Sequence, residues 1–356
     1  MAGSRRMRRG LLLGVVALAI LLVVGVAARV AVDRNHSTDK ASRRGLLVET
    51  VSEYKNVETV AGGNGRGSVA TKLDYPRGVA VDADDKVYVA DTANNRVQLW
   101  VPGATEGVTV AGGNGKGSEL NQLDSPRDVA VDASGNIYIA DWNNHRVQKW
   151  VARCSSACSG VTVAGGTAPG SAANLLQYPT GVALDAARNL YVADTANNRV
   201  QKWVPDATSG VTVAGGNGQG AAANQLNTPS GVALDIAGNI YVADAANYRV
   251  QKWALNATSG VTVAGGNGYG SAANQLSAAN GVAVDEAQNV YVADYNNNRV
   301  QRWAPNTTSG VQVAGGTAYG SAANQLNFPS KVAVSILDKN LYVADYGNHR
   351  VQKWSP

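Results

Sequence analysis

The sequence predicts an all-β fold, a six-bladed β-propeller of four-stranded antiparallel blades, preceded by one N-terminal transmembrane helix. Three observations support this prediction. A unit of about 50 residues recurs six times over residues 57–356. Each unit holds four short apolar runs bounded by Gly, Asn, Asp or Pro, and one long uncharged run lies near the N-terminus. Units of this length with four strands each are typical of propeller blades.

Residues 1–56 hold the basic character of the 356-residue chain. They carry ten Lys or Arg and four Asp or Glu, a net charge of +6, whereas the whole chain has +5. The remaining residues, 57–356, carry 21 basic and 22 acidic side chains, a net charge of −1. Because nucleic-acid binding depends on positive charge, a nearly neutral propeller argues against nucleic acid as a partner.

The apolar run within residues 11–32 is long enough to cross a membrane. Leu11–Ala28 contains no charged side chain, and three more apolar residues follow Arg29. About 18–20 apolar residues match a hydrocarbon core of roughly 30 Å. Four arginines precede the run, namely Arg5, Arg6, Arg8 and Arg9. Since basic residues stay on the cytoplasmic side, the propeller should lie outside the cytoplasm.

These features divide the chain into a cytoplasmic basic tail (1–10), a transmembrane signal-anchor (11–32), a juxtamembrane stalk (33–56) and the propeller (57–356). This arrangement is that of a single-pass type II membrane protein, anchored through residues 11–32. The small residues around Gly25–Ala28 leave one alternative, a cleaved signal peptide and a secreted protein.

A tryptophan closes the phrase RVQKW, or a variant of it, in every repeat. The six positions are Trp100, Trp150, Trp203, Trp253, Trp303 and Trp354. Their spacings of 50, 53, 50, 50 and 51 residues fix the period. A solenoid is the alternative architecture. It needs atypical polar repeats at its ends, and the terminal units here are ordinary.

The second unit illustrates the four expected strands. They are Val129–Asp132, Ile137–Asp141, Arg146–Val151 and Gly160–Ala164, each rich in β-branched and aromatic residues. No helical run of ten residues separates them. Strand alternation then places the loops after the second and fourth strands on one face. The loop between the third and fourth strands lies on the other face.

The first and last units complete each other. The last unit ends after its third strand, and the first begins with a lone fourth-strand phrase, Val57–Gly63. We expect Val57–Val60 to pair with Arg350–Trp354 as the outer strand of the last blade. This pairing would close the ring and remove an exposed sheet edge.

The phrase Asp-x-x-Asn-His-Arg-Val, at Asp141–Val147 and Asp345–Val351, resembles the NHL repeat. The other four units keep the Asn and Arg of this motif and replace its His. The resemblance covers residues 57–356 and implies a propeller fold, but it does not define one function, because NHL propellers serve many roles. The resemblance extends to the extracellular sensor domains of some bacterial receptor kinases, to RNA-binding tripartite-motif proteins and to zinc-dependent amidating lyases. A catalytic zinc site needs three protein ligands, and the propeller has only His145 and His349.

An Asp and an Arg five residues apart flank a four-residue turn in every repeat. The pairs are Asp91 and Arg96, Asp141 and Arg146, Asp194 and Arg199, Asp244 and Arg249, Asp294 and Arg299, and Asp345 and Arg350. A catalytic group need not recur six times in one register. We therefore interpret these pairs as structural ion pairs that lock the turn.

Other candidate sites are local. A second ring of acids, at the ends of the expected inner strands, can accept backbone N–H bonds in the next turn; it comprises Asp82, Asp132, Asp185, Asp235 and Asp285. A calcium ion on the axis is the alternative, although we expect no cofactor and no metal. Cys154 and Cys158 lie in one loop and are candidates for a disulfide. Asn256 and Asn306 begin Asn-x-Ser/Thr sequons and are glycosylation candidates.

The repeats differ most in the loops after their second and fourth strands. Five residues there have the character of interface anchors, namely Arg77, Arg127, Trp142, Tyr295 and Tyr346. We expect them to form a face that binds a protein, peptide or glycan, as an interaction or sensor module. No catalytic constellation is found, so we do not expect an enzyme. The alternatives are a metal-dependent extracytoplasmic hydrolase or lyase, and an RNA-binding propeller.

Overall fold

The computed structural model describes residues 54–151, 158–166, 168–316, 318–335 and 338–356. The predicted tail and signal-anchor, and nearly all of the stalk, lie outside the described residues. Within the described ranges, no helix is long and apolar enough to span a membrane.

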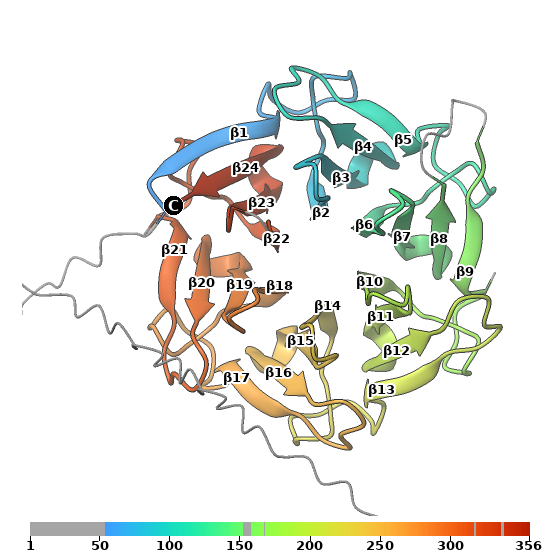
Figure 1. Cartoon of the computed structure of the whole chain (residues 1–356), viewed down its shortest axis with the longest axis vertical. Coiled ribbons are helices and arrows are strands. Elements are labelled where there is room, and N and C mark those ends of the chain that lie inside the picture. The colour runs from blue at the N-terminus through green and yellow to red at the C-terminus, as the bar shows by residue number, and fades with distance from the viewer. Residues whose placement is uncertain (1–53, 152–157, 167, 317, 336–337) are drawn as a thin grey trace, which may run out of the picture. The chain divides into compact units, whose positions relative to one another are not determined.

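The described strands form six four-stranded antiparallel sheets arranged as blades around a central axis (Figure 1). The inner strands are β2 (Pro76–Val81), β6 (Pro126–Val131), β10 (Pro179–Leu184), β14 (Pro229–Leu234), β18 (Ala279–Val284) and β22 (Pro329–Val334). The second strands are β3 (Val87–Asp91), β7 (Ile137–Asp141), β11 (Leu190–Asp194), β15 (Ile240–Asp244), β19 (Val290–Asp294) and β23 (Leu341–Asp345). The predicted propeller of antiparallel blades is confirmed.

The outer half of each blade follows the same order. The third strands are β4 (Arg96–Trp100), β8 (Arg146–Trp150), β12 (Arg199–Trp203), β16 (Arg249–Trp253), β20 (Arg299–Trp303) and β24 (Arg350–Ser355). The outer strands are β5 (Val108–Gly112), β9 (Val161–Gly165), β13 (Val211–Gly215), β17 (Val261–Gly265), β21 (Val311–Gly315) and β1 (Asn56–Gly62). Blades are numbered 1 to 6 in the chain order of their inner strands. The inner strand of blade 2 begins three residues before the predicted Val129, because a proline is tolerated as the first residue of a strand.

The first and last strands of the propeller close the ring. β1 pairs with β24 in antiparallel register, with Val57 opposite Trp354 and Thr59 opposite Gln352. Figure 1 shows the blue β1 as the outermost strand of the red sixth blade. The predicted closure is therefore confirmed, and a solenoid with open ends is excluded.

The hydrophobic core consists of six similar clusters, each between two neighbouring blades. One of them joins Trp100 and Val89 of blade 1 to Tyr342 and Val351 of blade 6. Each second strand is buried along its whole length, for example β3 and β11. This burial explains the nearly continuous apolar phrase YVAD, because a strand covered on both sides does not need an alternating polar face.

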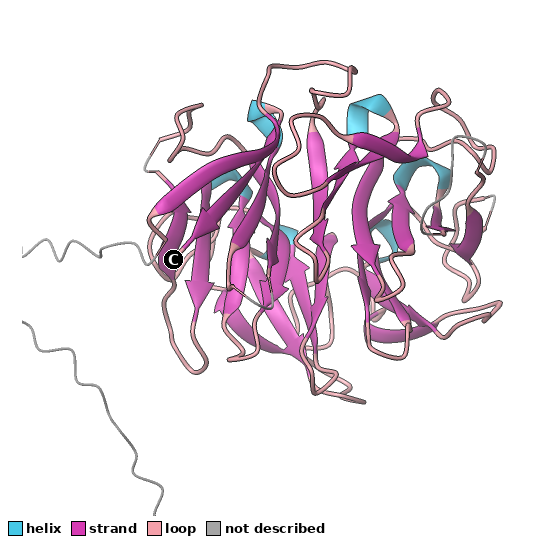
Figure 2. Cartoon of the chain, turned by 45° about the horizontal axis from the view of Figure 1, so that its top comes forward, coloured by secondary structure: helices cyan, strands magenta, loops and turns pink. Residues whose placement is uncertain are grey.

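Two kinds of loop share one face of the propeller, here called the η face. One is the short 3-10 turn after each second strand, and the other is the loop from each outer strand to the next inner strand. Figure 2 shows the turns as cyan segments at the strand ends. They are η1 (Thr92–Asn94), η2 (Trp142–Asn144), η3 (Thr195–Asn197), η4 (Ala245–Asn247), η5 (Tyr295–Asn297) and η6 (Tyr346–Asn348).

Candidate binding site

A buried aspartate at the end of each second strand organises the η face. In blade 1, Asp91 accepts hydrogen bonds from the backbone N–H of Asp74 at 2.7 Å, from Asn94 Nδ2 at 2.8 Å and from Arg96 Nε at 2.7 Å. Arg96 Nη2 also donates to the carbonyls of Val69 and Lys72. The network therefore fixes both the η turn and the loop that precedes the inner strand.

The structure places both members of all six Asp/Arg pairs in contact, with Nε–Oδ2 distances of 2.7–2.9 Å. Burial raises the pKa of Asp91, and hydrogen bonds from Asn94, Asp74 and Arg96 oppose this shift. Both oxygens of each carboxylate are occupied by neighbouring protein groups. The pairs therefore act as structural locks, and the asparagine is a third member that the sequence analysis did not assign.

In five of the six described blades, the residue before the third strand forms a hydrogen bond to the next blade. His349 Nδ1 accepts the backbone N–H of Tyr75 at 3.1 Å, and His145 Nδ1 accepts that of Tyr178 at 3.1 Å. In other blades an asparagine Oδ1 makes the same contact, as Asn95 does with the N–H of Ser125. An accepting Nδ1 requires a neutral imidazole. In accord with this, burial lowers the pKa of both histidines.

One ion pair crosses the axis of the propeller, and the space along this axis is here called the axial channel. Lys331 Nζ of β22 lies 2.7 Å from Asp128 Oδ2 of β6, and both side chains are almost completely buried. The other four inner strands carry glycine at the corresponding position, the third residue of the strand. At Gly281 a Cβ would lie 2.7 Å from the Cα of Lys331, so the strands approach too closely there for a side chain. Burial raises the pKa of Asp128, and the ammonium group of Lys331 opposes this shift.

Hydroxyl groups at the second position of the inner strands connect the blades around the axis. Ser330 Oγ donates to the carbonyl of Arg77 at 2.8 Å, and Thr180 Oγ1 donates to that of Ser230 at 2.8 Å. Ser230 Oγ in turn donates to the carbonyl of Asn280 at 2.7 Å. These groups surround a hollow of about 40 Å³ on the axis, which Arg77, Arg127 and Asn280 also line.

Two arginines occupy that second position in blades 1 and 2. The Cζ atom of Arg77 lies 4.4 Å from the ring centroid of Tyr346, and that of Arg127 lies 4.0 Å from the ring centroid of Trp142. Neither guanidinium forms a hydrogen bond or an ion pair with any residue that the structure describes. Arg127 Nε is moreover buried without a partner. Burial and the charge of Arg77 lower the pKa of Arg127 to about 10.

Aromatic rings surround the two arginines. Tyr346 lies 4.7 Å from Tyr75 and 6.0 Å from Tyr295, measured between ring centroids. Trp142 lies 4.9 Å from Tyr178. The five residues predicted as binding-face candidates thus lie on the η face at the mouth of the axial channel. Tyr75 and Tyr178 extend the cluster beyond the residues that the sequence analysis selected.

The remaining predicted sites lie elsewhere. Asn256 and Asn306 are exposed in loops on the opposite face, and their glycosylation stays a prediction. Cys154 lies outside the described residues, so its disulfide with Cys158 also stays a prediction. The second ring of acids accepts backbone N–H bonds, as Asp132 Oδ1 does from Ser134 and Asn136 at 2.9 Å each.

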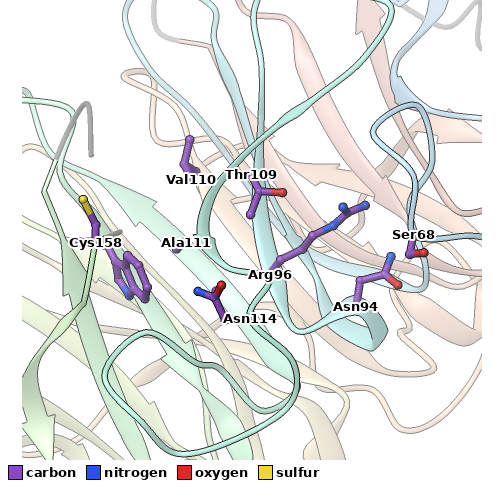
Figure 3. A pocket seen from close by; sticks show the side chains of 11 residues that line it. Ser68, Asn94, Arg96, Thr109, Val110, Ala111, Asn114 and Cys158 are labelled. Atoms are coloured by element: carbon purple, nitrogen blue, oxygen red, sulfur yellow. The ribbon is translucent and has the colours of Figure 1, made fainter. Parts of the chain in front are cut away.

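A larger pocket of about 350 Å³ lies away from the axis, between blades 1 and 2 (Figure 3). Arg96 and Asn94 line it, but both already hold Asp91. Across the described part of the chain, no three His, Cys, Asp or Glu side chains gather in a way that could hold a metal ion. Asp128, which lines the axial hollow, is paired with Lys331.

The fold and its closed ring define a six-bladed β-propeller whose blades share one repeated motif. The model of the NHL repeat matches residues 73–99, 123–150, 176–203, 226–253, 276–303 and 326–354, one match in each blade. The chain belongs to the NHL-repeat family.

Solved structures share this fold at low sequence identity. A protein of unknown function from Bacteroides thetaiotaomicron aligns at 17% identity and a TM-score of 0.65, covering 84% of this chain and 75% of that one. An auxiliary nutrient binding protein from the same organism aligns at 13% identity and a TM-score of 0.63, over 84% and 76% of the two chains. A gluconolactonase from Xanthomonas campestris aligns at 12% identity and a TM-score of 0.58, covering 84% of this chain and 89% of that one. A search among curated proteins finds no significant match.

Proposed function

We propose that this protein is a ligand-binding module that recognises a protein, peptide or glycan at the mouth of its axial channel. One observation supports the proposal most strongly. Arg77, Arg127, Trp142, Tyr295 and Tyr346 come from four different blades and gather at one end of the axis. Rigid strands and locked turns hold these side chains in place, and arginine and aromatic residues are the common anchors of interfaces.

We infer that binding, rather than catalysis, is the role of this surface. The six buried aspartates hold arginines, and both propeller histidines accept backbone hydrogen bonds. Relatives in fold include a nutrient binding protein and a gluconolactonase, so the fold accommodates both roles. Metal analysis of the purified protein tests this inference, because stoichiometric calcium or zinc would favour a hydrolase or lyase.

We further propose that residues 11–32 anchor the chain in a membrane with the propeller outside the cytoplasm. The uncharged run and the preceding arginines support this orientation. The charge of −1 over residues 57–356 also favours a ligand other than nucleic acid. Trypsin should digest the propeller in intact cells if this topology is correct. Digestion only after the cells are opened would contradict it.

The binding surface can be tested with a five-residue variant of the full chain, R77A/R127A/W142A/Y295A/Y346A. A panel of peptides and glycans would be screened for binding to the wild-type protein and to this variant. The matched control carries V204A, I236A and L255A, because these side chains are exposed by 53%, 92% and 62% in loops on the opposite face. We expect binding to be lost only in the first variant. Unchanged binding by a folded five-residue variant would refute the surface assignment.

A further inference from the structure

We propose that the mouth of the channel binds the oxyanion group of a ligand, a carboxylate, sulfate or phosphate, between Arg77 and Arg127. This inference rests on the proposed function and specifies the chemistry of its ligand. The rest of the ligand would lie over the surrounding aromatic rings. The inference follows from the charge, the geometry and the size of the site.

The first argument is uncompensated positive charge. Neither Arg77 nor Arg127 has a carboxylate partner among the described residues, and Lys331 already neutralises Asp128 on the axis. Burial, and after it the repulsion between the two guanidinium groups, lowers the pKa of Arg127. A partly buried charge is costly unless an opposite charge meets it. An anion placed between the two arginines would offset their repulsion and would give both guanidinium groups a partner of opposite charge.

The geometry of the two arginines also sets the direction in which their free N–H donors point. Each guanidinium lies over an aromatic ring, Arg77 over Tyr346 and Arg127 over Trp142. Stacking fixes the plane of a guanidinium, and its N–H groups point outward in that plane. Arg127 Nε is buried and has no acceptor among the residues that the structure describes, and a buried donor normally has one. The N–H donors of a guanidinium group form a planar fork, and a planar or tetrahedral oxyanion is the acceptor that best matches it.

The third argument is size. The hollow on the axis holds about 40 Å³, which is enough for a small group but not for a whole ring. Asn280 lines the same hollow from blade 5 and adds an amide to the two guanidinium groups. A ligand can therefore insert one small polar group at the axis, while its remaining surface contacts Tyr75, Tyr346 and Trp142. This division favours a ligand in which the oxyanion is terminal.

The test is isothermal titration of the full chain in detergent micelles. The probes are sodium sulfate, sodium phosphate, D-glucuronate and the neutral sugar D-glucose, so that a free oxyanion is distinguished from one carried on a sugar. We expect at least one oxyanion probe to bind and glucose to bind about 10-fold to 100-fold more weakly, the range that a hydrogen bond to a charged group provides. R77Q/R127Q should reduce the affinity for the oxyanion by a similar factor. R77K/R127K keeps the charge but loses the planar fork of N–H groups, so its affinity should lie between those of the wild type and R77Q/R127Q.

The matched control is R188Q/K202Q, which removes the same charge from exposed or half-exposed positions outside the η face. We expect it to bind like the wild type. The inference would be overturned if R77Q/R127Q still bound the oxyanion, or if the control lost as much affinity as R77Q/R127Q. It would also be overturned if none of the three oxyanion probes bound to the wild type. The proposed function would survive those results if W142A/Y295A/Y346A still abolished the binding of a ligand from the peptide and glycan panel. Melting temperatures of every variant would show that it is folded.

Discussion

Lys331 Nζ lies 2.7 Å from Asp128 Oδ2, and the pair connects blade 6 to blade 2 past the inner strand of blade 1. Asp128 Oδ2 also accepts the backbone N–H of Val182 in blade 3 at 3.0 Å. One carboxylate thus joins three blades at the axis. Because Lys331 occupies the carboxylate of Asp128, Arg77 and Arg127 have no carboxylate partner among the described residues.

The first prediction concerns this pair. K331G should lower the free energy of unfolding by about 3 kcal/mol, because removing one partner leaves a buried charge unpaired. D128G/K331G should be within about 1 kcal/mol of the wild type, since it installs the glycine found in the other four blades. Denaturant unfolding measures both variants. A double variant as unstable as K331G would contradict the pairing.

The second prediction concerns pH. His145 and His349 must stay neutral to accept their backbone N–H groups, and their pKa values are lowered in the folded protein. The unfolded chain therefore binds more protons as the pH falls below about 6.5, and stability should decrease there. We expect a loss of about 1 kcal/mol for each histidine between pH 7.5 and pH 5. Thermal unfolding over this range measures the effect.

The control for the pH effect is H145N/H349N. Asparagine already performs the same task in other blades, where Asn198 Oδ1 accepts the N–H of Thr228 at 2.9 Å. Asparagine does not titrate, so the variant should lose the pH dependence and keep its stability at pH 7.5. Asp74, 3.7 Å from His349 Nδ1, opposes the shift at that site. An unchanged pH profile in the variant would exclude these histidines as its source.

The third prediction concerns ring closure. Deletion of residues 57–63 should lower the melting temperature sharply, because it removes β1 and leaves the edge of β24 unpaired. A synthetic peptide of residues 54–63 should restore part of the lost stability when added to the deleted protein. A scrambled peptide is the control. The same melting temperature with and without residues 57–63 would contradict the closure.

The fourth prediction concerns the buried Asp/Arg pairs. Arg249 contacts Asp244 and donates to the carbonyls of Ala221, Ala222 and Gln225. R249K keeps the charge but cannot reach all these acceptors, so we expect a loss of about 2 kcal/mol. The control R188K changes an exposed arginine and should have no measurable effect. Equal melting temperatures for the two variants would show that the guanidinium contacts contribute little.

The parts of the fold that repeat along the chain are the parts that the sequence predicts best. Six copies of one phrase determine six blades, and the incomplete first and last units predict the pairing of Val57–Val60 with Arg350–Trp354. The η face followed from strand alternation alone. The sequence alone therefore assigns the variable residues Arg77, Arg127 and Trp142 to one surface.

The axial pair could not be predicted in this way. Asp128 and Lys331 are 203 residues apart in the chain, and nothing local to either residue indicates the other. One signal was present: both replace the glycine at the third position of the inner strand, and they carry opposite charges. The absence of a partner for Arg127 Nε depends on the packing of several blades, which periodicity does not determine.

The closure of blade 6 by β1 has a consequence for biosynthesis. Among the strands of the propeller, the outer strand of that blade is made first, and its partner, Arg350–Ser355, is made last. The ring therefore cannot be completed until Arg350–Ser355 has left the ribosome. A product truncated before β24 would keep an open seam, with β1 and β23 lacking their common neighbour. Such a product would expose two strand edges to other chains, so the resistance of the propeller to edge-to-edge aggregation would depend on Arg350–Ser355.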